Sequence, residues 1–130
     1  MVLRDIVYDA RPNIKRRIAG EDLEAGEAVY LSGPETVKKT TGASLSGAFD
    51  GIAMDSVSEG EWLGVVGEPT QVYAVASGTI NAGDYIAPDA DGKVAAATTG
   101  AAVIIGYAVR PASNNIVLMK LSTIVNSDSL

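Results

Sequence analysis

The chain has 130 residues, enough for one domain with a hydrophobic core. It contains no cysteine and no histidine, which excludes disulfides and thiolate metal sites and disfavours an enzyme or a zinc protein. The net charge is −6; residues 1–17 carry five cations and two anions, or +3, so the remainder carries −9. Because an acidic body repels nucleic acid and anionic membranes, neither is expected as a partner.

The first 19 residues are expected to form an extended, basic N-terminal arm. Cations alternate there with apolar side chains, a pattern that can become ordered on a partner surface. The residues expected to form this binding arm are Val2, Leu3, Arg4, Ile6, Val7, Tyr8, Arg11, Ile14, Lys15, Arg16 and Arg17. A solvated, frayed terminus is the alternative.

The rest of the chain has the pattern of an all-β domain. Fourteen glycines and five prolines divide it into short runs rich in Val, Ile, Thr and Tyr. Strands are expected at residues 15–19, 28–31, 36–40, 48–54, 62–66, 71–76, 84–87, 93–97, 102–109 and 115–121, followed by a polar tail at 122–130. The expected core consists of Leu23, Val29, Leu31, Val37, Ile52, Ile80, Ile86, Val94, Ile104 and Val117.

Residues 20–121 contain an internal repeat. The Ala-Gly-acid element at Gly26 returns 57 residues later at Gly83, and residues 51–54 return as 106–109. Two copies are too few for a solenoid, so the sequence predicts one small barrel-like or sandwich domain in which two similar β units close on each other. Gly26, Gly83 and Gly92 are expected in turns, where glycine permits a positive φ.

Trp62 is the single tryptophan. Large aromatic side chains are prominent both in cores and in interfaces. The sequence favours a place for Trp62 in the seam between the two units over a role as a surface anchor.

Two short patterns partly resemble known sites of chemistry. Asp89 and Asp91 resemble the start of a calcium loop, but Lys93 and an apolar run follow where further oxygen ligands are needed. Asp50 precedes a glycine without the Ser or Thr of an aspartic-protease turn, and the repeat has no matching acid. No catalytic residue, metal site or cofactor is expected, and the chain is predicted not to be an enzyme.

The sequence resembles the capsid decoration proteins, also called cement or head-stabilising proteins, of tailed bacteriophages and related viruses. The resemblance rests on residues 23–30, 80–94, 105–109 and 116–121, and it covers about residues 14–121. It implies a β-rich, often trimeric body that sits on the outer surface of an icosahedral capsid. The body would stabilise the capsid by clamping neighbouring subunits.

The partner implied by this resemblance is the major capsid protein, with residues 1–19 as the capsid-binding arm. The protein would be made in the host cytoplasm and reside in the virion. A non-catalytic β-sandwich module that binds carbohydrate or peptide within a larger assembly is the alternative, and a small hydrolase that uses only carboxylates is a third class.

Overall fold

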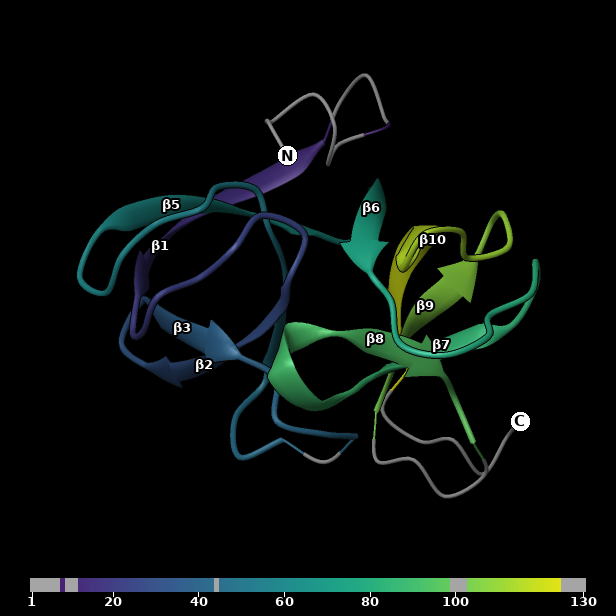
Figure 1. The fold of residues 1–130 in the computed structure, drawn as a ribbon. Coiled ribbons are helices and arrows are strands. Elements are labelled where there is room, and N and C mark those ends of the chain that lie inside the picture. Colours follow the sequence, from purple (N-terminus) through teal and green to yellow (C-terminus); the bar gives the residue numbers. More distant parts are fainter. Residues whose placement is uncertain (1–7, 9–11, 44, 99–102, 125–130) are drawn as a thin grey trace.

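The computed structural model describes residues 8, 12–43, 45–98 and 103–124, whose strands form two units that lie side by side (Figure 1). The first unit contains β1 (Asn13–Ala19), β2 (Ala28–Gly33), β3 (Thr36–Lys39), β4 (Phe49–Ala53) and β5 (Trp62–Gly67). The second contains β6 (Gln71–Val75), β7 (Tyr85–Pro88), a 3-10 turn η1 (Ala90–Gly92), β8 (Val94–Ala96), β9 (Ile104–Ala108) and β10 (Ile116–Ile124). The all-β class is confirmed, and every expected strand is present with ends displaced by a few residues.

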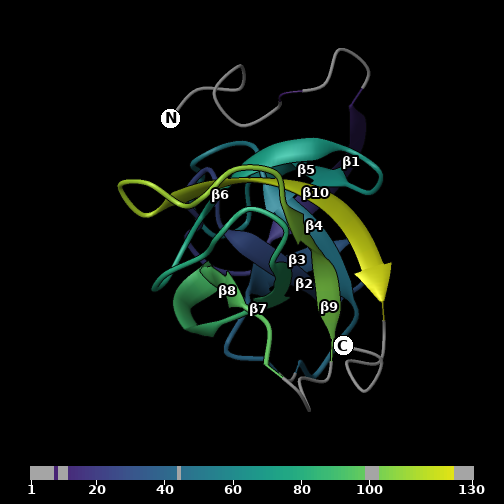
Figure 2. The same cartoon turned by 90° about the vertical axis from the view of Figure 1, so that its right-hand side faces the viewer.

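The strands of the first unit close into a barrel in the order β1-β3-β2-β4-β5. Neighbours are antiparallel except β1 and β3, which pair in parallel at Ala19 and Val37. The second unit has the order β6-β10-β9-β7-β8 (Figure 2), and a parallel bridge joins Ala76 to Val94. The barrel therefore closes within the first unit and not, as expected, between the two.

The two units are copies of one topology. The parallel pair Ala76 and Val94 in the second unit is equivalent to the parallel pair Ala19 and Val37 in the first. Each residue lies 57 positions after its equivalent. The turn bonds match as well, because the N–H of Gly26 donates to the Ala53 carbonyl and that of Gly83 to the Ala108 carbonyl, both at 2.8 Å. The structural repeat begins before residue 20, where the repeat in the sequence begins, because β1 and β6 are equivalent strands.

The turn glycines lie where the backbone needs them. Gly26 and Gly83 occupy equivalent turns with φ values of 94° and 88°, and Gly92 has a φ of 72° in the β7–β8 connection. These are left-handed conformations that residues with a Cβ atom adopt at a cost.

The hydrophobic core has two parts. Leu23, Val29 and Val37 fill the barrel together with Leu63 and Val65. A larger cluster fills the second unit and continues across the junction to the outer face of the first unit. Of the expected core residues all are buried except Leu31, which is half-buried.

Backbone hydrogen bonds also cross the junction. The N–H of Val75 donates to the Gly26 carbonyl at 2.9 Å, and the N–H of Gly92 donates to the Thr40 carbonyl at 3.0 Å. The shared core and these bonds hold the two units together as one body. Among the described residues, no helix has the length and apolar character needed to cross a membrane.

Candidate interaction surface

β1 contains the last part of the expected arm, and its side chains alternate between the inner and the outer face of the barrel. Successive residues of a strand point to opposite faces. Ala19 is buried in the barrel, and Lys15 and Arg17 share its face, whereas Ile14 and Arg16 lie on the outer face. Residues 13–19 are therefore a barrel strand, paired with β5 from Asn13 to Ile18.

Lys15 and Arg17 bind Asp50. The Nζ atom of Lys15 lies 2.9 Å from Oδ1 of Asp50, and Nε of Arg17 lies 2.9 Å from Oδ2. The pairing of β2 with β4 skips Asp50, which makes it the extra residue of a β-bulge. These two cations, expected to face a partner, are thus engaged inside the molecule.

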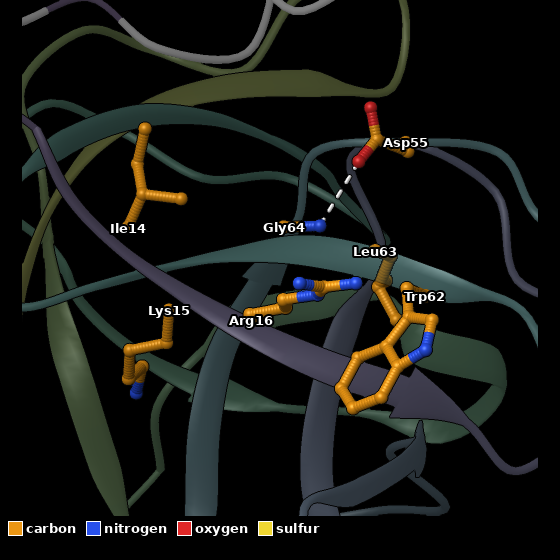
Figure 3. A pocket seen from close by; sticks show the side chains of 7 residues that line it. All are labelled: Ile14, Lys15, Arg16, Asp55, Trp62, Leu63 and Gly64. Carbon is orange, nitrogen blue, oxygen red and sulfur yellow. Dashed lines mark hydrogen bonds between the residues drawn. The ribbon is translucent and has the colours of Figure 1, made fainter.

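The outer face of the same strand forms a hollow of about 400 Å³ beside β5 (Figure 3). Its lining residues are Ile14, Lys15, Arg16, Asp55, Trp62, Leu63 and Gly64. The guanidinium carbon of Arg16 lies 4.3 Å from the centroid of the Trp62 ring, a cation–π arrangement. We refer to these residues as the Trp62 hollow.

The expectation that Trp62 fills the seam between the units is wrong. Its side chain is 47% exposed, and Ile14 beside it is 46% exposed. Leu63 and Val65 fill the barrel, so strand alternation directs Trp62 and Gly64 outward. The alternation of Trp62 and Gly64 with the apolar Leu63 and Val65 is present in the sequence and predicts this outward direction.

Tyr8 packs against the second unit. Its N–H donates to the Gln71 carbonyl at 3.0 Å, and its ring meets that of Tyr73 edge-on with centroids 6.2 Å apart. The Arg110 guanidinium lies over the Tyr8 ring at 5.5 Å, and Tyr8 remains 51% exposed. The other expected arm residues, Val2, Leu3, Arg4, Ile6, Val7 and Arg11, lie outside the described residues.

A second exposed apolar face lies on β7 and β9. Tyr85 pairs with Tyr107 across these strands, and they are 46% and 41% exposed, with Val109 at 39%. The equivalent pair in the first unit is Ala28 and Ile52, which face each other across β2 and β4. Sequence reasoning missed this face, because alternation alone does not tell which side of a sheet is covered.

The face equivalent to Tyr85 and Tyr107 is buried in the first unit. Ala28, Ile52 and Met54, which is equivalent to Val109, belong to the core cluster that continues into the second unit. The repeat thus has a contact face that the first unit uses and the second leaves exposed.

No group of three or more acidic side chains that could hold a metal ion occurs within the described part of the chain. The Asp89–Asp91 segment forms a turn, in which the N–H of Asp89 donates to the Lys93 carbonyl at 2.8 Å.

Comparisons with known proteins find likenesses among solved structures only. No protein-family model matches the sequence, and no curated protein matches it either. The structure is similar to that of the head fiber gp8.5 N base in bacteriophage phi29, with a TM-score of 0.68 and 20% sequence identity. The similarity covers 86% of this chain and 95% of that one. At this identity the comparison establishes that the two chains share a fold.

Proposed function

We propose that this protein is a non-enzymatic structural protein of a phage head that binds the outer surface of an icosahedral capsid and clamps neighbouring subunits of the major capsid protein. The observation that carries the proposal is the fold shared with a phage head fiber base over 86% of the chain. Such a protein needs contact surfaces and no reaction centre. The Trp62 hollow and the face around Tyr107 meet that need.

Charge supports the same proposal. Apart from residues 1–17, the chain carries a net charge of −9, which favours solubility before assembly and repels the packaged genome. The basic N-terminal residues and the exposed Arg16 offer attraction to an acidic shell surface. Charge of this kind accelerates encounter, and apolar contacts retain the complex.

We further propose that the protein assembles as a homotrimer. The exposed face of Tyr85, Tyr107 and Val109 is equivalent to the face that the first unit buries against the second. A second copy that places its first unit on this face would repeat the contact already present within one chain. Such a head-to-tail contact makes a ring when its rotation closes.

The oligomer is tested with Tyr107→Glu. The substitution places a charge in the proposed interface, so sedimentation equilibrium should show a trimer for the unmodified protein and a monomer for the variant. Thr79→Glu, which adds the same charge in an exposed loop of the same unit, should remain trimeric. A monomeric unmodified protein at micromolar concentration would refute the trimer.

Attachment is tested on particles. Gold-labelled antibody against this chain should decorate purified particles produced by the genome that encodes it. Purified protein should also co-sediment with shells from which it has been deleted. Particles that neither contain the protein nor bind it would contradict the proposed function.

A carbohydrate- or peptide-binding module is the second candidate, favoured by the exposed ring of Trp62. Modules of that kind present aromatic faces to their ligands. Arg16 covers one face of the Trp62 ring, which leaves less of a stacking platform. Glycan binding by the isolated protein, without shell binding, would favour this candidate.

A further inference from the structure

The first unit lies against a gap between the edge strands of the second. Within the described residues these edge strands, β6 and β8, meet at a single bridge between Ala76 and Val94. Next to that bridge, the N–H of Val75 donates instead to the Gly26 carbonyl of the first unit at 2.9 Å. The first unit therefore covers the second where its own strands do not pair.

The side chains that meet in this contact are apolar on both sides. Val72, Ala74 and Ile105 of the second unit belong to the same buried cluster as Ala28 and Ile52 of the first unit. Within one chain, the two units are thus held together by the burial of small and medium-sized apolar side chains.

The first unit has the same gap with different side chains. Its strands β1 and β3 pair only at Ile18 and Ala19 in the part of the chain that the structure describes. The three positions equivalent to the apolar residues of the second unit hold Lys15, Arg17 and Asp50. The side chains of Lys15 and Arg17 point inward from β1, yet they are 29% and 21% exposed. We refer to these three residues as the cationic gap, because two cations share one acid and solvent reaches them.

The opposite surface has changed as well. The positions of Ala28 and Ile52 hold Tyr85 and Tyr107 in the second unit, and these two rings are 46% and 41% exposed. Both halves of the contact within one chain thus recur uncovered, with cations in place of apolar residues on one half and tyrosines on the other. A cation and the face of an aromatic ring attract each other, so the two changed halves match each other in chemistry.

We propose that, in the homotrimer, Tyr85 and Tyr107 of one copy pack against Lys15 and Arg17 in the cationic gap of the next copy. The two cations keep their bonds to Asp50 and present their remaining surface to the rings. The inference rests on the proposed trimer and names the two surfaces that meet in it.

A glycine determines how closely the units approach within one chain. A Cβ atom at Gly92 would lie 2.9 Å from the Cβ atoms of Glu27 and Lys39 in the first unit, which is too close for such atoms. The equivalent position of the first unit is Glu35, 57 residues earlier, which has a Cβ atom. Two copies therefore meet at a greater separation than the two units of one chain. Longer cationic and aromatic side chains fill that wider space.

Sedimentation equilibrium tests the contact at about 0.15 M salt, where the repulsion between the acidic bodies is screened beyond about 8 Å. Tyr107→Phe keeps the ring and should leave the dissociation constant of the trimer within about twofold. Tyr107→Leu keeps an apolar side chain without a ring and should weaken the trimer by about tenfold or more.

The cation is tested from the other side of the contact. Arg17→Met keeps the length of the side chain without its charge and should weaken the trimer to a similar extent. Adding Tyr107→Leu to this variant should cost little more, because each change removes the same interaction. Urea unfolding checks that every variant is folded.

A cross-link locates the contact directly. Protein with the photoreactive residue benzoylphenylalanine at position 107 is mixed with isotopically labelled, unmodified protein. Irradiation should join it to β1 or β4 of a labelled copy, the strands that hold the cationic gap. The same photoreactive residue at position 79, in an exposed loop of the same unit, should not react with these strands.

The outcomes separate this contact from the trimer itself. Unmodified protein that is monomeric at micromolar concentration would refute the trimer and the contact together. A trimer that Tyr107→Leu and Arg17→Met leave unchanged would overturn the contact and leave the trimer standing. Cross-links from position 107 that are confined to other strands would do the same.

Discussion

Arg17 and Asp50 face each other from β1 and β4, with Nε of the guanidinium 2.9 Å from Oδ2 of the carboxylate. The Asp50 side chain is 4% exposed, whereas that of Arg17 is 21% exposed. The long cationic side chain thus reaches a buried acid from the surface and keeps contact with water. At the equivalent positions the second unit has Ala74 and Ile105, which are buried in the shared core.

Removing Asp50 alone should destabilise the fold. In Asp50→Ile the half-buried Lys15 and Arg17 lose their counter-charge, at a cost of about 2–4 kcal/mol. Adding Lys15→Val and Arg17→Ala copies the residues of the second unit, Val72 and Ala74, and should recover much of that loss, because it removes the uncompensated charges. Urea unfolding of the single and triple variants measures the difference. A triple variant less stable than the single one would contradict this account.

Strands and core were predictable from the sequence because their signals are local. Alternating apolar residues identify a strand, and Gly26 and Gly83 mark where the chain turns. Barrel closure was not predictable, because it depends on the pairing of Ala19 with Val37, for which no local pattern exists. The closure brings β1 into the body and shortens the expected arm.

The ion cluster had a signal that sequence reasoning did not use. Aligning the repeats places Asp50 at the position of Ile105, and an acid at an otherwise apolar position indicates a buried charge with a partner. The Trp62 hollow could not be derived in this way. It requires knowing that Asp55 and Ile14, 41 residues apart, lie on one face.

Gly51 and Gly106 allow equivalent close approaches of the backbone. A Cβ atom at Gly51 would lie 2.0 Å from the Val66 carbonyl oxygen, and one at Gly106 would lie 2.0 Å from that of Lys120. Because both contacts are with backbone, Gly51→Ala and Gly106→Ala should each cost about 3 kcal/mol or more.

The matched control is Gly42→Ala, where no atom lies within 4 Å of the added Cβ. It should change the unfolding free energy by less than about 0.5 kcal/mol. Thermal and urea unfolding of the three variants provide the measurement. Tolerance of alanine at either close-approach position would show that the strands can separate there.

Glu27 should make the stability fall as the pH rises. Burial raises the pKa of this carboxyl above its ordinary value, against the opposing effect of its backbone hydrogen bond and of Lys39. The folded chain therefore holds the proton more tightly than the unfolded chain, and stability is lost as the pH rises through the raised pKa. Glu27→Gln removes this loss and retains an oxygen that can accept the N–H of Glu24, now 2.7 Å from Oε1.

Glu27→Gln should thus be more stable than the unmodified protein at neutral pH. The gain should disappear at pH values below those at which the carboxyl titrates in the unfolded chain. Urea unfolding of both proteins from about pH 3 to pH 7 follows the difference. A difference that is constant over this range would refute the role of ionisation.

Truncation separates the arm from the barrel. Deleting residues 1–11 removes Tyr8, whose half-exposed packing is worth about 1 kcal/mol, and leaves β1 intact, so the body should stay folded. Deleting residues 1–19 removes β1, breaks the barrel and leaves Asp50 without its cations. That longer truncation should not fold.

The shorter truncation also decides what the arm does. If residues 1–11 help to clamp the capsid, their deletion should greatly weaken co-sedimentation with shells that lack the protein. Arg16→Glu, which lies outside the deletion on the exposed face of β1, should weaken it mainly at low salt, because screening reduces the contribution of charge to encounter. Occupancy equal to that of the full-length chain at every salt concentration would show that the body alone makes the attachment.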